Sequence, residues 1–147
     1  MPDALNLPTA VARSLAIWHE MAASKSMDRL ASISADDCLF RSPAFYKPYR
    51  DKQALQIVLS SVITVFEDFA YHRTFTGTDG HDVVLEFSAR IGDVQLKGVD
   101  IIRFNTDGKI AEFEVMVRPM NALIALGKRM SEIAGPQLRA LGDPDKA

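Results

Sequence analysis

The sequence of 147 residues contains a single cysteine, Cys38, so an internal disulfide and a multi-cysteine zinc site are both excluded. No hydrophobic run approaches the ~20 residues that a membrane-spanning helix needs. Positive charge is also scarce, because 17 Lys and Arg residues stand against 19 Asp and Glu residues, for a net charge of −2. Nucleic acids and anionic membranes are bound through clustered positive charge. We therefore expect neither nucleic acid nor membrane as a partner.

Motifs that would define a function directly are missing too. The sequence has no Gly-rich phosphate loop and no Ser-His-Asp arrangement, and its three histidines are too dispersed to suggest a metal site. We expect no metal and no cofactor. The first residues, Met1-Pro2-Asp3-Ala4, lack the basic region of a secretory signal. These absences favour a cytoplasmic enzyme or small-molecule-binding protein.

Hydrophobic residues make up 48% of the sequence, which is enough for the core of one domain spanning residues 1–147. The apolar residues first recur at helical spacing and later alternate, so helices are followed by strands. The pattern predicts helices over 8–24, 27–34 and 52–66, a short strand over 37–42, strands over 70–76, 83–91, 94–104 and 110–118, and a final helix that begins at Pro119 and is stopped by Gly135-Pro136. Residues 137–147 are expected to form a frayed tail.

Helices that are separated from a run of strands define the α+β class. We predict a cone-shaped, curved antiparallel sheet wrapped around the N-terminal helices. A sheet that curls around a long helix encloses a space of the kind that often binds ligands.

One acidic residue does not fit the strand over 94–104. The side of this strand that matches the apolar faces of its neighbours consists of Leu96, Gly98, Asp100, Ile102 and Phe104. The opposite faces carry charges that can pair across strands, as Glu86 can with Lys97. Asp100 is therefore expected on an apolar inner face, where the loss of water raises the pKa of a carboxyl. Such a carboxyl can donate a hydrogen bond to a substrate oxygen or act as general acid or base.

The structural alternative is that Asp100 accepts hydrogen bonds from Tyr46, Tyr49 or His19 and only braces the interior. His19 lies on the inner side of the first helix and could instead pair with Asp100 as a base for proton transfer. Ser42 could contact a ligand at the floor or mouth of the cone. Tyr46 and Tyr49 belong to an aromatic loop that could cover an apolar ligand. The remaining candidates for the cavity wall are Trp18, Phe40, Phe87, Phe113 and Val115.

The run GVDIIRFNTDGKI, residues 98–110, resembles the nuclear transport factor 2-like superfamily, in which a strand ends in an Asp-Gly-Lys-Ile turn before the next strand. The segment SADDCLF, residues 34–40, is similar to the entry of that family into its first strand. The likeness spans about residues 8–120, and the SnoaL-like branch looks closest. The resemblance implies a cystatin-like roll. It leaves the function open, because the superfamily includes isomerases, dehydratases, cyclases, hydrolases and non-catalytic proteins.

The ketosteroid isomerases of this superfamily allow a comparison at three catalytic positions. Their oxyanion-binding aspartic acid matches Asp100, in the same Asp-x-x-Arg-Phe-Asn setting. Their catalytic base, an Asp before a Pro, falls on Ser42, and serine cannot shuttle a proton at neutral pH without a base beside it. Their oxyanion-binding tyrosine falls on Trp18, which can donate one N–H bond. The resemblance therefore implies that only Asp100 is kept in kind.

Two functions remain open. The first is an isomerase, dehydratase or cyclase that acts on a small hydrophobic carbonyl compound by acid/base chemistry with Asp100. The second is a non-catalytic module that binds a small apolar or aromatic ligand, or serves mainly to dimerise. The outer sheet face mixes Val99, Ile101 and Met116 with charged residues, and related folds often dimerise through this surface. We therefore expect a homodimer formed through the sheet face.

Overall fold

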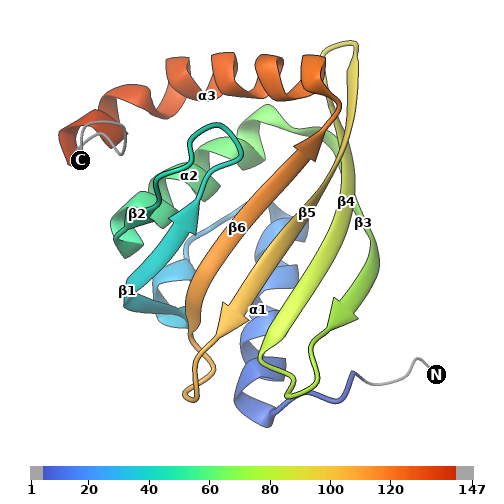
Figure 1. Ribbon diagram of the computed structural model, residues 1–147, viewed down its shortest axis with the longest axis vertical. Coiled ribbons are helices and arrows are strands. Elements are labelled where there is room, and N and C mark those ends of the chain that lie inside the picture. Colours follow the sequence, from blue (N-terminus) through green and yellow to red (C-terminus); the bar gives the residue numbers. More distant parts are fainter. Residues whose placement is uncertain (1–4, 142–147) are drawn as a thin grey trace.

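The computed structural model describes residues 5–141, which form one six-stranded sheet and three α-helices (Figure 1). The strands lie in the order β2-β1-β6-β5-β4-β3. All neighbouring strands are antiparallel except β1 and β6, which are parallel. The elements, in chain order, are α1 (Thr9–Ser24), a 3₁₀ turn (Leu30–Ile33), β1 (Ser34–Arg41), β2 (Tyr49–Arg50), α2 (Lys52–Val65), β3 (Glu67–Thr76), β4 (Asp82–Ile91), β5 (Val94–Phe104), β6 (Ile110–Arg118) and α3 (Met120–Leu141).

Two tight turns set the register of the central strands. Gly92 joins β4 to β5 and has φ +59°, and Gly108 lies between β5 and β6 with φ +75°. Glycine adopts these positive φ values without the strain that a Cβ would cause. The hairpin between β4 and β5 pairs without interruption from Ile91–Val94 to Asp82–Arg103. The ends of β5 and β6 are therefore those that the sequence predicts.

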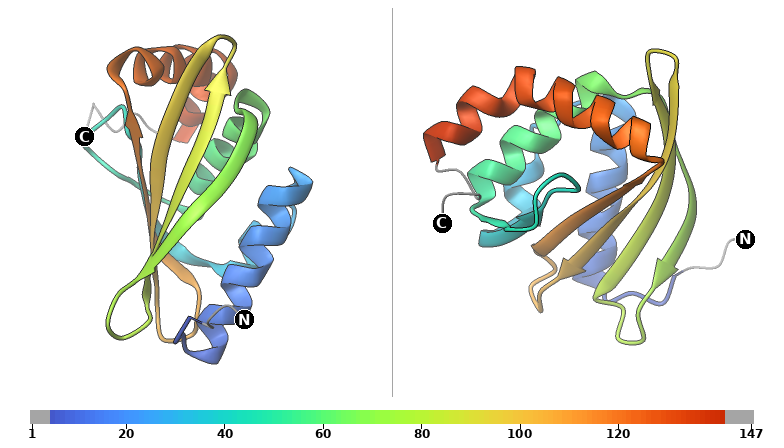
Figure 2. Two further views of the ribbon diagram at one scale, coloured as in Figure 1. Left: turned by 90° about the vertical axis from the view of Figure 1, so that its right-hand side faces the viewer. Right: turned by 45° about the horizontal axis from the view of Figure 1, so that its top comes forward.

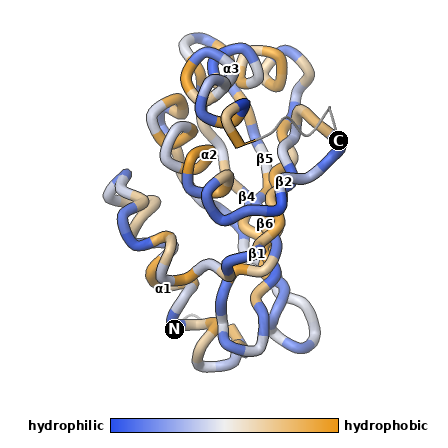
Figure 3. The backbone as a smooth tube through the Cα atoms, turned by 90° about the vertical axis from the view of Figure 1, so that its left-hand side faces the viewer, coloured by the Kyte–Doolittle hydropathy of each residue, from blue (hydrophilic) through white to orange (hydrophobic). Residues whose placement is uncertain are grey.

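The helices cover the concave side of the sheet. Figure 2 shows α1 and α2 against one face of the curved sheet, while α3 crosses its end and packs beside α2. The N-cap of α2 is Asp51, whose side chain accepts a hydrogen bond from the Gln53 amide at 2.6 Å. The hydrophobic stretches of the chain lie mainly in the strands and in the faces of the helices that meet them (Figure 3). Phe40, Phe104 and Phe113 are fully buried between these layers.

The charged residues of the convex face also match the expected pattern. Glu86 lies between two cations, with Arg73 at 2.7 Å and Lys97 at 3.2 Å. These partners, Arg73 first, lower the pKa of Glu86 to about 2. The predicted pairing of Glu86 with Lys97 is confirmed, and it identifies the other side of β5, which carries Asp100, as the inner one.

Several details of the sequence prediction are wrong. The second helix is only the short 3₁₀ turn, and the first strand begins at Ser34 and is parallel to β6, so the sheet is mixed. The last helix does not stop at Gly135-Pro136 but continues to Leu141, so residues 137–141 are helical, and the rest of the expected tail lies outside the described residues. Proline in a helix interior costs ~3 kcal/mol. Here Ala134 is fully buried and Leu138 packs against the core, which offsets that cost.

Within residues 5–141, no helix combines the length and the apolar character that crossing a bilayer requires.

Candidate functional site

A cavity of about 450 Å³ lies between the concave face of the sheet and the helices. It falls in the range of about 300–1,000 Å³ that is typical of small-molecule sites. Its wall is mostly apolar and comes from the three α-helices, from single positions on β1, β2, β5 and β6, from the start of β3, and from the loop between β1 and β2. Members of the wall that matter below are Trp18, Lys25, Phe40, Ser42, Tyr49, Tyr71, Asp100, Val115, Ser131, Gly135, Leu138 and Arg139.

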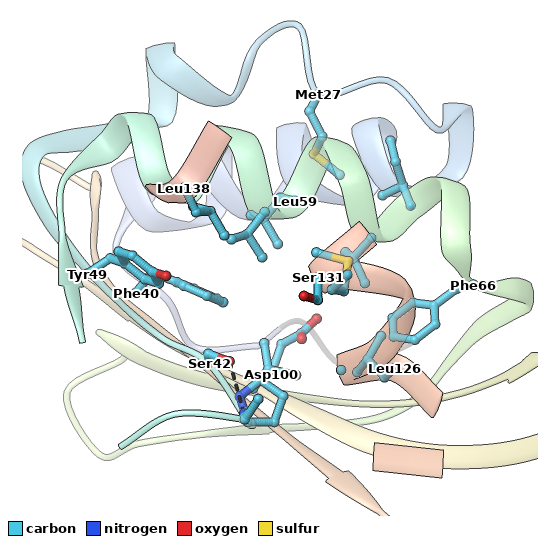
Figure 4. Close-up of a pocket in the computed structure, with 18 of the residues that line it drawn as sticks. Met27, Phe40, Ser42, Tyr49, Leu59, Phe66, Asp100, Leu126, Ser131 and Leu138 are labelled. Atoms are coloured by element: carbon cyan, nitrogen blue, oxygen red, sulfur yellow. Dashed lines mark hydrogen bonds between the residues drawn. The ribbon is translucent and has the colours of Figure 1, made fainter. Parts of the chain in front are cut away.

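Asp100 lies in the wall of this cavity, near the middle of β5. Its neighbours in register are Leu85 on β4 and Val115 on β6, and its side chain turns toward the helices, into the space shown in Figure 4. Only 6% of the residue is exposed. The predicted position of Asp100, on an apolar inner face beside a cavity, is confirmed.

A chain of two hydrogen bonds fixes the Asp100 carboxyl. The indole Nε1–H of Trp18 donates to the hydroxyl of Tyr71 at 2.9 Å, and that hydroxyl donates to Asp100 Oδ2 at 2.6 Å. Three elements, α1, β3 and β5, thus meet through one polar chain inside an apolar layer. A buried carboxyl with one short hydrogen bond is held in a defined orientation.

The second carboxyl oxygen of Asp100 is left for a ligand. Oδ1 accepts no hydrogen bond from the described residues. Among residues 5–141, every side-chain oxygen that is fully inaccessible has a hydrogen-bond partner. Oδ1 has none, so it is accessible, and the cavity that Asp100 lines is the space from which it is reached. A substrate group placed there would meet an acid or base whose other oxygen is already anchored.

Burial governs the protonation of this site. It raises the pKa of Asp100 to about 7, and the hydrogen bond from Tyr71 acts in the opposite direction. Burial, and then the neighbouring Asp100, raise the pKa of Tyr71 well above its ordinary value, so Tyr71 stays a donor. Near neutral pH both the carboxylic acid and the carboxylate of Asp100 are therefore populated.

His19 does not reach Asp100 as expected. The hydrogen bond that Asp100 accepts comes from Tyr71, and His19 packs edge-to-face on the ring of that tyrosine, with 5.4 Å between the ring centroids. His19 is not part of the cavity wall. Burial lowers the pKa of His19, which favours its neutral form. The predicted Asp100–His19 hydrogen bond is wrong, because the Tyr71 hydroxyl is the donor to Asp100 and His19 contacts only the Tyr71 ring.

Three other candidates also lie outside the cavity wall. Phe87 is buried in a second core cluster, stacked on Phe69 with 5.1 Å between the ring centroids. Phe113 is fully buried behind Trp18, at 5.3 Å between centroids. Tyr46 is 98% exposed. Neither phenylalanine contacts the cavity, and the solvent-exposed ring of Tyr46 does not cover it.

The remaining candidates meet at the cavity as predicted. Phe40, Ser42, Tyr49 and Val115 all line it, and Trp18 does so while giving its only N–H to Tyr71. The Ser42 Oγ accepts a hydrogen bond from the Ala44 amide at 2.9 Å, which leaves its own proton available. Ser42 therefore offers a hydrogen-bond donor at the position where the resemblance implied a base.

Two parts of the site were not predicted from the sequence. Tyr71 was not identified as a partner of Asp100, because β3 alternates weakly and its pairing with β4 shifts register twice. The whole α3 contribution was also missed, including Leu126, Ser131 and Leu138. The spacing Met130, Ala134, Leu138 was a signal for it, since residues four apart share one side of a helix.

No group of His, Cys, Asp and Glu in the described part of the chain has an arrangement suited to a metal ion. Cys38 is fully buried, and burial raises the pKa of its thiol to about 11, so it is an inert core residue.

Comparison with protein families places residues 15–113 in the SnoaL-like domain. The chain belongs to this family. The resemblance to the nuclear transport factor 2-like superfamily is thereby confirmed, and the matched residues include β5 with Asp100, α2, β1 and α1 from Leu15 onward. A comparison with curated protein sequences gives no significant match.

Solved structures similar to this SnoaL-like chain include an enzyme. A steroid delta-isomerase from Pseudomonas aeruginosa is 47% identical, with a TM-score of 0.88 over 92% of this chain and 99% of the other. An uncharacterized protein with a cystatin-like fold from Silicibacter pomeroyi is 31% identical, with a TM-score of 0.74 over 88% and 86% of the two chains. A putative SnoaL-like polyketide cyclase from Jannaschia sp. is 10% identical at a TM-score of 0.63, covering 91% and 98%, and shares the fold alone.

Proposed function

We propose that the protein binds a hydrophobic carbonyl compound in the cavity and moves a proton on it, so that a carbon–carbon double bond shifts toward the carbonyl. The observation that carries this proposal is the Asp100 carboxyl, the only carboxyl in the described cavity wall, with Oδ1 open to the cavity. The 47% identity to a protein named steroid delta-isomerase supports an isomerisation as the first reaction to test.

The chemistry follows from the two protonation states of Asp100. In the carboxylate form, Oδ1 takes a proton from the carbon between the carbonyl and the double bond, and the C–H electrons move into the carbonyl system. The protonated Oδ1 then returns the proton to the far end of the former double bond. One C–H bond breaks and another forms, so nothing else is consumed. A base with a pKa near the working pH suits this exchange.

Two hydroxyl groups can support the carbonyl oxygen during this transfer. The Ser42 proton is available, and the Ser131 hydroxyl on α3 has no hydrogen-bond partner among residues 5–141. A hydrogen bond to the oxygen that gains charge lowers the barrier. Tyr71 is a positioning residue, because its proton goes to Asp100 Oδ2.

A second function is favoured by one observation. Ser42 supplies no carboxylate, Trp18 has no free N–H, and His19 lies outside the cavity wall, so Asp100 has no partner base there. A protein that only binds a small apolar or aromatic carbonyl ligand, with protonated Asp100 as hydrogen-bond donor, fits the same geometry. The two functions differ in whether solvent protons enter the ligand.

The test uses cyclohex-3-en-1-one and a β,γ-unsaturated 3-ketosteroid in D₂O. We expect the absorbance of the conjugated ketone to rise, and deuterium to enter the product, with a rate that increases as pH rises through about 7 because the base form of Asp100 is needed. Asp100→Asn should lower this rate by about 100-fold or more. Asp28→Asn, at an exposed position outside the cavity wall, is the matched control and should leave the rate unchanged.

Binding is measured in parallel with 2-acetylnaphthalene and 2-ethylnaphthalene, which differ mainly in the carbonyl. The proposal is contradicted if Asp100→Asn retains the wild-type rate. If neither ketone is isomerised but wild type prefers 2-acetylnaphthalene and Asp100→Asn does not, the protein is the binding module instead.

A further inference from the structure

Two cations belong to the cavity wall, and no anion other than Asp100 accompanies them within residues 5–141. Lys25 is the C-cap of α1, and Arg139 lies in the last turn of α3. Neither forms an ion pair with the described residues. Three further aspartates of the sequence, Asp3, Asp143 and Asp145, lie outside these residues. The described wall is thus apolar with an excess of positive charge.

The Arg139 side chain folds back along α3 toward the cavity. A Cβ added at Gly135 would lie only 3.0 Å from Arg139 Nη1 and 3.7 Å from Cζ, so the guanidinium rests on the bare face of that glycine. Both residues line the cavity. The helix dipole favours a cation near a helix C-terminus, whichever way its side chain points. The dipole therefore explains why a cation is found in this turn, but not why its guanidinium lies against the cavity wall.

Arg139 and Asp100 lie in different parts of the cavity wall. Ser131 and Arg139 are eight residues apart on α3, which is roughly 12 Å along the helix axis. In Figure 4, Leu138 lies toward the end with Tyr49 and Phe40, whereas Asp100 and Ser131 lie nearer the end with Leu126. A ligand that fills the cavity therefore has room for two polar groups, one at each site.

We infer that the cavity takes an amphipathic ligand, with an apolar body and a single anionic group such as a carboxylate, which Arg139 binds. The planar guanidinium matches a carboxylate or sulfonate with two parallel N–H donors. Lys25 adds attraction from α1. This inference deepens the proposed function, because the carbonyl of the same ligand is the group assigned to Asp100, but the anion site itself is tested separately.

The experiment compares two fluorescent probes with the same rings. The first is 8-anilinonaphthalene-1-sulfonate, and the second is N-phenyl-1-naphthylamine, which lacks the sulfonate. We expect the full chain at low salt to bind the sulfonate more tightly, and 2-acetylnaphthalene to displace both. Arg139→Gln should weaken binding of the sulfonate about fivefold to tenfold, as one charge-assisted pair contributes, and change binding of the neutral probe less than twofold. Lys128→Gln, an exposed α3 residue outside the wall, is the matched control.

The inference is overturned if Arg139→Gln leaves sulfonate binding at the wild-type level, if it weakens both probes equally, or if 2-acetylnaphthalene fails to displace the sulfonate. These results are separate from the proposed function. If wild type isomerises the ketone but shows no preference for the anionic probe, the anion site is wrong and the role of Asp100 stands. If the preference for the anionic probe depends on Arg139 but Asp100→Asn does not affect the carbonyl ligand, only the anion site stands.

Discussion

At the scale of single residues, Asp100 is subject to two effects that shift the pKa of its carboxyl in opposite directions. Its environment is apolar, which favours the neutral acid, and its one hydrogen bond comes from Tyr71, which favours the carboxylate. The first effect is larger, so the carboxyl keeps its proton up to about pH 7. A surface aspartate would have lost it about three pH units lower.

This imbalance predicts how stability depends on pH. The pKa of Asp100 is raised in the folded state, so between about pH 4 and 7 the folded chain holds a proton that the unfolded chain has lost. The stabilising contribution is complete below the unfolded pKa and disappears as pH rises through about 7. Between pH 5 and 8, wild type should therefore lose about 2–3 kcal/mol relative to Asp100→Asn, which cannot titrate.

Urea unfolding at several pH values measures this difference. Asp28→Asn serves as control and should follow the wild-type curve. Parallel pH curves for wild type and Asp100→Asn would mean that the carboxyl is not desolvated.

At the scale of elements, β5 and β6 show what a sequence specifies well. Their adjoining ends are set by the turns at Gly92 and Gly108, and the alternation of buried positions along β5 identifies the inner face. The partner of Asp100 could not be found in this way, because Tyr71 lies on a strand whose pairing slips between Tyr71 and Thr74. The continuation of α3 past Pro136 depends on burial of Ala134 and on packing of Leu138, which local sequence rules do not contain.

At Gly98 on β5, the absence of a side chain lets neighbouring residues pack directly against the backbone of the strand. An added Cβ would lie 2.5 Å from the Met116 carbonyl oxygen and 2.5 Å from Phe87 Cζ. Gly98→Ala should therefore destabilise the protein by about 1–3 kcal/mol. Gly127 on α3 has nothing within 4 Å of such a Cβ, so Gly127→Ala should be stabilising by about 0.5–1 kcal/mol through helix propensity. Urea unfolding of both variants checks this, and a neutral Gly98→Ala would contradict the packing.

At the scale of the whole molecule, the sequence predicted the architecture and the place of the cavity, but not all of its wall. The fold follows from patterns that repeat along each element. The wall depends on which elements meet in space, and Phe87 and Phe113 show the difference: both face inward from β4 and β6, yet other core side chains cover them.

The outer face of the sheet has the partly exposed apolar residues on which the prediction of a homodimer rests. Met116 is 50% exposed, and Val99 and Ile101 beside it on β5 are half-buried. We propose that two copies pair these faces around a twofold axis. Met116→Lys should then yield a monomer in sedimentation equilibrium, whereas Ile124→Lys, at an exposed apolar position on α3, should not. A wild-type chain that sediments as a monomer at all concentrations contradicts this proposal.

The role of Asp100 is tested by titration of its carboxyl, which can be followed by the ¹³Cγ chemical shift in protein labelled at aspartate, with Asp100→Asn to assign the signal. We predict a midpoint at about pH 7, and a higher one in Tyr71→Phe, because the hydrogen bond from Tyr71 favours the ionised form. A midpoint near 4, the value of an aspartate in water, would contradict it.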